Sequence, residues 1–232
     1  MNQDMTIVYY TANVIPDHFM EFTKSELIKS AKLAGDLPIV SVSHKPMDLG
    51  ENIVVDLERH TVNIYKQVLI GAKAAKTKYV VMAEDDALYS PDHFMHRPTD
   101  GVFAYNFTAW GIYTWVKPAV YSHKARHVMW AMMCERQLLI DALELRFAKY
   151  PDIHEVPLRS WSEPGKYERH LGLPELKMED FYTVNPIIVF SHETAIAYDN
   201  LGKRKRLGVL RAYDIPYWGK AEDLLKQYTG EV

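Results

Sequence analysis

The chain has 232 residues, of which 48% are hydrophobic and 25% charged, a composition typical of one globular domain and not of a disordered chain. Its formal net charge of −3 excludes a general polyanion binder, so contact with nucleic acid would need a local basic patch. The single cysteine, Cys134, excludes an intramolecular disulfide and favours a reducing, cytoplasmic compartment. We expect neither a signal peptide nor a membrane span, because no basic stretch leads into an apolar run and no uncharged apolar run is long enough.

The first half of the chain alternates strand and helix patterns. Strands are expected over residues 6–10, 38–43, 52–57 and 79–83, and helices over residues 20–34 and 61–75. Strands that alternate with helices are joined by parallel crossovers, so the pattern predicts an α/β fold with a Rossmann-like, mixed but mostly parallel central sheet flanked by helices. In such sheets ligands bind at the carboxyl ends of the strands.

The second half of the chain is less regular. Strands are expected over residues 102–107, 112–116, 127–133 and 186–190, with a helix over residues 135–149. An irregular, aromatic segment with Gly and Pro spans residues 159–182, and a short helix lies near the C-terminus. No clear linker interrupts the chain, so we expect a single domain over residues 1–232.

Three adjacent acids, Glu84, Asp85 and Asp86, follow the apolar strand over residues 79–83. Adjacent carboxylates repel one another and are costly to remove from water. A divalent cation such as Mg²⁺ or Mn²⁺ offsets that cost, because these ions take oxygen ligands and share their shell with substrate phosphates. Since alternate residues of a strand point the same way, Glu84 and Asp86 are expected to face one pocket, with Asp85 turned away. The alternative is a solvated acidic turn.

The stretch over residues 63–87 resembles the region that leads into the DxD motif of GT-A glycosyltransferases, in particular family-2-like enzymes. Asn63, Gly71 and Ala75 stand at matching places, and the three acids stand where DxD would. The loop after the first strand, YYTAN, occupies the place of the donor-nucleobase loop. The resemblance covers residues 6–86 well and the rest loosely.

This resemblance implies a GT-A fold whose residues 1–90 bind a nucleotide-diphosphate sugar and whose residues 91–232 hold the acceptor. A divalent metal, Mn²⁺ or Mg²⁺, would bridge the diphosphate and stabilise its charge as the glycosidic bond breaks. Asp86 would be the principal metal ligand, Glu84 would act through the ribose or the metal, and Asp85 is able to replace either.

The donor nucleotide would also contact the loop residues Thr11, Ala12 and Asn13. Many relatives keep an acid just after the second strand to read the base, and SVSHKP has none. Asp56, in the third strand, is the candidate substitute, so the identity of the base stays open.

Two later features are candidates for the same site. His192 ends an apolar strand, and several GT-A families supply a late histidine as a further metal ligand; the alternative is a histidine that only hydrogen-bonds at a strand end. Lys203, Arg204 and Arg206 lie in a basic run that resembles the mobile loop closing over the diphosphate in this fold. They are alternatively a solvated turn or a contact to a polyanionic acceptor.

The catalytic base of an inverting transfer would be a carboxylate that takes the proton from the acceptor hydroxyl. Family-2-like relatives carry it in an ED pair, and Glu179 and Asp180 offer one here, although a strand and not a helix follows. Glu163, in a Gly/Pro loop with aromatic neighbours, and Glu135, at a helix start, are alternatives. A retaining transfer without such a base also stays open.

The sequence therefore predicts a metal-dependent glycosyltransferase whose acceptor is a saccharide, a protein or a hydroxymethylated base in DNA, as in small bacteriophage enzymes. No protein partner is implied. A nucleotidyltransferase is disfavoured because no glycine-rich loop follows the first strand. The remaining alternative is a non-catalytic nucleic-acid-binding module, which would depend on residues 203–206 and not on the acids.

Overall fold

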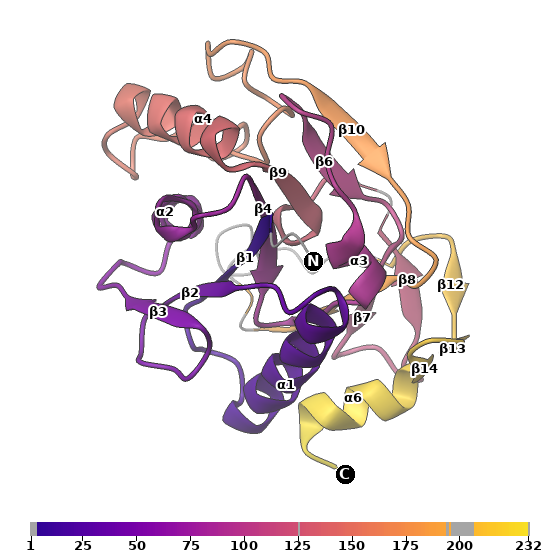
Figure 1. Cartoon of the computed structure of the whole chain (residues 1–232). Coiled ribbons are helices and arrows are strands. Elements are labelled where there is room, and N and C mark those ends of the chain that lie inside the picture. Colours follow the sequence, from indigo (N-terminus) through magenta and orange to yellow (C-terminus); the bar gives the residue numbers. More distant parts are fainter. Residues whose placement is uncertain (1–3, 125, 194, 196–206, 232) are drawn as a thin grey trace.

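The computed structural model describes residues 4–124, 126–193, 195 and 207–231. A mixed seven-stranded sheet with the order β10-β6-β9-β4-β1-β2-β3 forms its centre (Figure 1). The strands are β1 (Met5–Thr11), β2 (Ile39–Ser43), β3 (Glu51–Val54), β4 (Tyr79–Glu84), β6 (Phe103–Asn106), β9 (Met132–Glu135) and β10 (Met178–Phe181). β4, β1, β2 and β3 are mutually parallel, and β9 runs antiparallel between β4 and β6. The predicted α/β fold with a mixed, mostly parallel sheet is confirmed.

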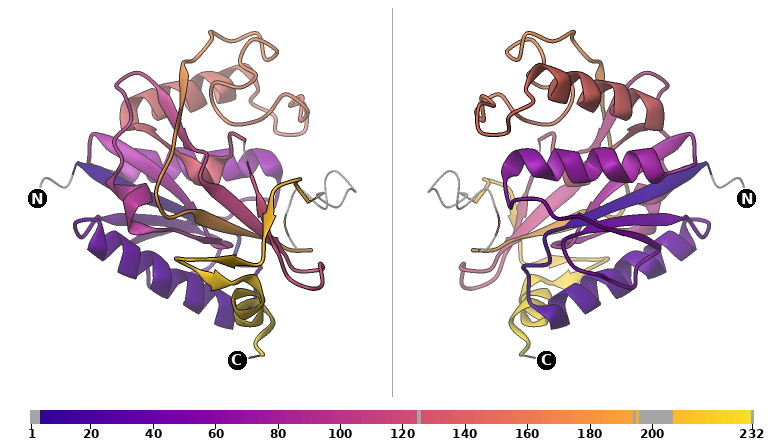
Figure 2. Two further views of the ribbon diagram at one scale, coloured as in Figure 1. Left: turned by 90° about the vertical axis from the view of Figure 1, so that its right-hand side faces the viewer. Right: turned by 90° about the vertical axis from the view of Figure 1, so that its left-hand side faces the viewer.

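The two faces of the sheet are covered by different helices (Figure 2). The helix α1 (Asp17–Leu33) packs on the face to which Met5, Ile7 and Tyr9 of β1 point. The opposite face carries Val8 and Tyr10 and is covered by α2 (Thr61–Ala74) and α4 (Arg136–Lys149). The alternation of side chains along β1 thus supplies apolar contacts to both layers, as expected for a central parallel strand.

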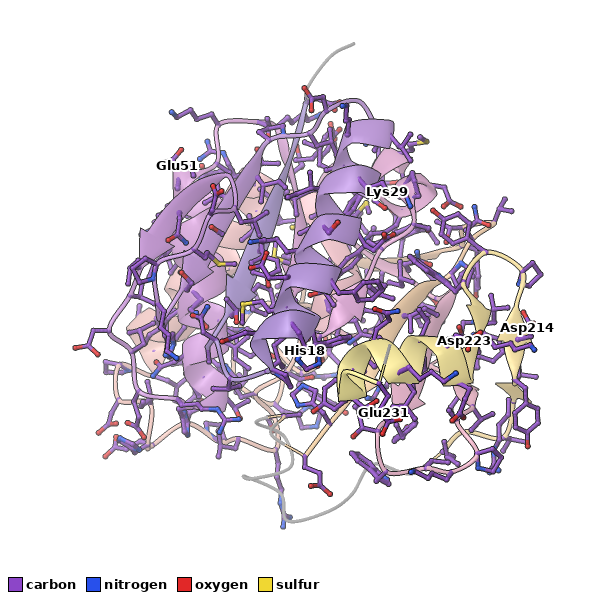
Figure 3. All side chains as sticks on the ribbon, turned by 90° about the horizontal axis from the view of Figure 1, so that it is seen from below. His18, Lys29, Glu51, Asp214, Asp223 and Glu231 are labelled. Atoms are coloured by element: carbon purple, nitrogen blue, oxygen red, sulfur yellow. The ribbon has the colours of Figure 1, made fainter. Side chains whose placement is uncertain are left out.

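A second, five-stranded sheet has the order β12-β8-β7-β11-β5. Its strands are β5 (Ala87–Leu88), β7 (Ala109–Tyr113), β8 (Tyr121–His123), β11 (Ile187–Ser191) and β12 (Arg211–Ala212). The helix α6 (Ala221–Thr229) packs beside α1, where the rings of Phe19 and Tyr228 lie 5.0 Å apart, and Figure 3 shows the two helices side by side. Shorter elements are α3 (Pro91–Met95), a 3₁₀ turn (Met129–Ala131), β13 (Asp214–Ile215) and β14 (Gly219–Lys220).

The acids lie at the junction of the two sheets. The chain leaves the seven-stranded sheet at Glu84 and enters the five-stranded one at Ala87, which is paired with Val189 of β11. The backbone N–H of Phe190 donates to the carbonyl of Asp86 at 2.8 Å. Two independent pairings therefore fix the backbone on both sides of the three carboxylates.

Several elements differ from the sequence-based expectation. The strand expected over residues 127–133 is wrong, because a 3₁₀ turn occupies Met129–Ala131 and β9 begins only at Met132. The strand expected over residues 112–116 lies at Ala109–Tyr113, and β3 ends at Val54. Residues 178–181, expected within an irregular segment, form β10 because they pair with β6. None of the helices in the described part of the chain has the length and apolarity that a bilayer crossing requires.

A buried ion pair organises the irregular segment between α4 and β10. Arg146 of α4 is fully buried, its Nη2 donates to Glu168, and its Nη1 donates to the carbonyl of Ser162 at 2.5 Å. The guanidinium also lies 5.6 Å from the ring of Trp161. Because Glu168 is only 4% exposed, the pair is removed from water and ties the loop around residues 161–168 to the helical layer.

Arg146→Met should lower the free energy of unfolding by about 3–5 kcal/mol, because the carboxylate of Glu168 would stay buried without a counter-charge. The double variant Arg146→Met, Glu168→Leu should recover most of that loss, since no charge is then left buried. Urea denaturation of both variants and the wild type measures the difference. A double variant no more stable than the single one would contradict the role given to the charge.

Candidate active site

A cleft of about 1000 Å³ opens at the carboxyl ends of β1 and β4. The register of these two parallel strands places Tyr10 opposite Glu84, so the loop after β1 and the three acids meet at one edge. This is the edge at which ligands bind α/β sheets. The lining residues that carry polar or charged groups include Thr11, Arg59, Gln67, Glu84, Asp85, Asp86, Arg126, His127, Arg159, Ser162, Glu163, Lys166 and His192.

Each of the three acids has a different partner. The hydroxyl of Tyr10 donates to Glu84 at 2.6 Å, and the hydroxyl of Thr11 donates to Asp85. The carboxylate of Asp86 lies 3.2 Å from Nε2 of His192. All three acids line the cleft, so the expectation that Asp85 turns away is wrong. The reason is that β4 ends at Glu84, and the alternation of side-chain directions ends with it.

The site disfavours the ionised form of Asp85. Burial, and then the neighbouring charge of Asp86, raises the pKa of Asp85 to about 6, although the hydrogen bond from Thr11 acts in the opposite direction. Burial and the adjacent Glu84 likewise hold the pKa of Tyr10 well above its ordinary value, so the phenol stays a hydrogen-bond donor. A positive ion placed among these acids would favour their charged forms.

Asp86 and His192 form the part of the site that best fits a cation. His192 follows β11 directly and is buried, and it meets Asp86 although 106 residues separate them in the chain. The second carboxylate oxygen of Asp86, Oδ1, is buried and has no hydrogen-bond partner among the described residues. Within the same residues, no group of three or more His, Cys, Asp or Glu side chains is placed to hold a metal. Carboxylate oxygens suit Mn²⁺ or Mg²⁺, and the imidazole favours the transition ion Mn²⁺ over Mg²⁺. Substrate oxygens and water would complete the shell of the ion.

The donor-side residues named from the sequence separate into two groups. Thr11, Ala12 and Glu84 line the cleft. Asn13 does not; its side-chain oxygen instead accepts the backbone N–H groups of His44 and Lys45, both at 2.9 Å, and ties the β1 loop to the β2 loop.

Asp56 is exposed beyond the end of β3 and does not line the cleft. Its charge acts on His44, where it partly opposes the lowering of the pKa by burial. Lys203, Arg204 and Arg206 lie outside the described residues.

Of the four carboxylates considered as the catalytic base, one lines the cleft and three do not. Glu163 lines the cleft, where it accepts from the hydroxyl of Ser162 and lies 3.3 Å from Nζ of Lys166. Asp180 lies on β10 and does not line the cleft, but it contacts His127, which does.

The remaining two candidates bond to backbone away from the cleft. Glu179 accepts the N–H of Thr99 at 2.8 Å, and Glu135 accepts the N–H of Gly101 at 2.7 Å.

Sequence reasoning missed the cations of the cleft and His127. Arg59, Arg126, Arg159 and Lys166 come from three loops, the last two from the segment between α4 and β10, and line the same cleft as the acids. None of them lies in a motif, and single basic residues in loops give no signal in one sequence. Their convergence suits an anionic ligand, which carboxylates alone would repel.

Of the comparisons with known proteins, only the one with solved structures found similarity. No protein-family model matches the chain, and no curated protein matches it significantly. Similar structures include a nucleotidyl transferase from Methanothermobacter, with 12% identity, 80% of this chain and 89% of that chain covered, and a TM-score of 0.47. A glycosyltransferase involved in the glycosylation of the major capsid of PBCV-1 is 12% identical, with a TM-score of 0.48. The similarity covers 80% of this chain and 93% of that chain.

A further similar structure is Staphylococcus aureus TarS in complex with UDP-GlcNAc, with 10% identity and a TM-score of 0.47. The similarity covers 83% of this chain but only 60% of that one. Because all three scores are below 0.5, the fold and the activity of this chain rest on its own residues.

Proposed function

We propose that this chain is a glycosyltransferase that moves a sugar from a nucleotide-diphosphate sugar to an acceptor hydroxyl. The observation that carries the proposal is the pair Asp86 and His192, placed at the carboxyl ends of the strands with a buried carboxylate oxygen that has no described partner. A nucleotide diphosphate brings the oxygen ligands that two protein side chains alone leave missing.

The donor nucleotide would lie across the carboxyl ends of β1 and β4, where Thr11 and Ala12 line the cleft. Asp86 and His192 would hold Mn²⁺ or Mg²⁺ next to the diphosphate, where the ion would supply stabilisation of the charge on the leaving group. Arg59, Arg126, Arg159 and Lys166 add positive charge around that position. Glu84, which accepts the hydrogen bond of Tyr10, would bind a ribose hydroxyl or the ion.

The acceptor would enter from the side of Glu163 and His127, which line the same cleft. We propose a saccharide, a protein or a hydroxymethylated base in DNA as the class of acceptor. The alternative reaction is a nucleotidyl transfer on a similar sheet. The two reactions differ in what leaves: glycosyl transfer releases a nucleoside diphosphate, whereas nucleotidyl transfer releases pyrophosphate.

Calorimetric titration of UDP, GDP and CDP and their sugars should show one nucleotide that binds with Mn²⁺ and not with EDTA. Asp86→Asn should weaken this binding at least about tenfold, which corresponds to about 1.4 kcal/mol. The matched control is Glu51→Gln on β3, an exposed carboxylate shown in Figure 3.

Wild type that binds no nucleotide under either condition, while remaining folded, would refute the proposal. In that case steep salt dependence of DNA binding would point to the nucleic-acid-binding alternative. Release of pyrophosphate in place of nucleoside diphosphate would instead identify a nucleotidyl transfer.

Asp85→Asn should stabilise the protein in EDTA at pH 8 by about 0.5–2 kcal/mol, because it removes one of three repelling charges from a functional site. The hydrogen bond from Thr11 has an acceptor in Asn as well. A carboxyl group whose pKa is raised by folding stabilises the fold less as pH rises, here between the ordinary aspartate pKa of 3.8 and about 6. The gain should therefore shrink as pH falls below 6 and vanish below 4, where the wild-type carboxyl is protonated.

Thermal unfolding of both proteins at pH 4 and pH 8, with EDTA and with Mn²⁺, measures the effect. The wild type should be stabilised more than the variant by Mn²⁺. An equal stability difference at the two pH values would contradict the charge explanation.

A further inference from the structure

His127 and Asp180 form a pair that the sequence did not reveal. Nε2 of His127 lies 2.8 Å from Oδ1 of Asp180, although 53 residues separate them in the chain. His127 lines the cleft, whereas Asp180 stands behind it on β10. Asp180 thus does not line the cleft itself but contacts the imidazole of His127, which does.

The strand pairing brings His127 to the same end of the sheet as the three acids. β9 runs antiparallel to β4, with Val81 opposite Met133 and Val80 opposite Cys134. The chain before β9 therefore runs alongside the end of β4, and Val128, Met129 and Trp130 line the cleft together with His127. The imidazole of His127 accordingly lines the cleft next to the proposed donor site.

The imidazole ring is held on three sides. The ring of Tyr105 lies 4.7 Å away and that of Phe107 5.1 Å away, both edge to face, and Asp180 fixes the third side. The hydroxyl of Tyr105 also donates to the carbonyl of Pro164 at 2.5 Å, beside Glu163, so the same residue supports both candidate bases. Such support keeps a reacting group in one orientation.

The hydrogen bond to Asp180 determines which ring nitrogen of His127 carries the proton. Asp180 accepts a hydrogen bond from Nε2–H, which leaves the lone pair of the neutral ring on Nδ1. Among the described residues Nδ1 has no hydrogen-bond partner. A carboxylate behind a histidine both fixes this tautomer and stabilises the imidazolium that forms when Nδ1 takes a proton.

Glu163 is less suited to accept a proton. It accepts a hydrogen bond from Ser162, and the ammonium of Lys166 lies 3.3 Å from the same oxygen. The Oε2 oxygen of Glu163 is therefore already engaged by two neighbours inside its own loop, whereas a general base needs a lone pair directed at the acceptor hydroxyl. Its position is better suited to binding a sugar hydroxyl.

We propose that His127 is the general base of the transfer and that Asp180 is its positioning residue, an inference that rests on the proposed glycosyl transfer. The acceptor oxygen forms a bond to the anomeric carbon of the donor sugar, and the bond from that carbon to the diphosphate oxygen breaks with its electron pair staying on the diphosphate. The acceptor proton goes to Nδ1 of His127 and then to solvent. Direct displacement of this kind inverts the anomeric configuration.

The charged and titratable groups around His127 are Asp180 from β10, Tyr105 from β6 and Arg126 beside it in the chain. Because the base has to be neutral to accept a proton, kcat should fall towards low pH in the wild type. Asp180→Asn removes the counter-charge of the imidazolium, so this low-pH limb should move to lower pH while the plateau of kcat falls.

The test measures release of nucleoside diphosphate from UDP-glucose, UDP-GlcNAc and GDP-mannose with Mn²⁺, first with water as acceptor and then with added hydroxymethylated DNA or saccharides. His127→Gln should lower kcat roughly 10²–10⁴-fold. Its calorimetric affinity for the nucleotide should stay within about twofold of wild type, because the base does not hold the donor. His154→Gln is the matched control, since Nε2 of His154 lies 3.4 Å from Glu58 outside the cleft.

The assignment would be overturned by His127→Gln with kcat near that of wild type, or with kcat and nucleotide affinity lost together. Asp180→Asn with an unmoved low-pH limb would overturn it as well, because the pair would then be structural. A wild type that binds the nucleotide but shows a larger loss in Glu163→Gln than in His127→Gln would transfer the role to Glu163. A wild type without nucleotide binding would refute the proposed function itself, and His127 with it.

Discussion

The three carboxylates depend on the two backbone pairings that hold them at the junction of the sheets. β4 is paired with β1 up to Glu84, and β5 is paired with β11 from Ala87, so only two residues lie between them. Repulsion among the acids would separate them in a flexible loop, but here the backbone has no freedom to relax. The strain is relieved in part by hydrogen bonds from Tyr10 and Thr11 and by His192. A cation would relieve the rest.

The opposite wall of the cleft depends on a different constraint. No regular element holds the loop with Glu163, and its position rests on the buried pair of Arg146 and Glu168 and on the hydrogen bond from Tyr105. Both supports come from the main sheet and its helical layer, so this wall is anchored to the core behind it. A site for chemistry between two substrates needs both walls fixed relative to one another.

The proposed transfer from an anionic donor accounts for the distribution of charge in the cleft. Three acids and a histidine lie at one place, and four basic side chains from three loops line the same cleft. A nucleic-acid-binding module would be expected to present the cations without the acids. In the proposed function, the acids and His192 would hold a divalent ion that supplies positive charge to a diphosphate, and the arginines and the lysine would add to that charge.

The sequence by itself determined the features that follow from local patterns. The alternation of strands and helices over residues 6–83, the position of the acids at the end of β4 and that of His192 just past β11 were all readable from it, because burial imposes a period on each element. Strands of two or three residues such as β5 carry no period, and the pairing of residues 178–181 with β6 made a strand of a segment that looked irregular. Contacts such as Asp86 with His192 and His127 with Asp180 join residues 106 and 53 positions apart. Only the tertiary structure decided these, because sheet order and not sequence distance sets which strand ends meet.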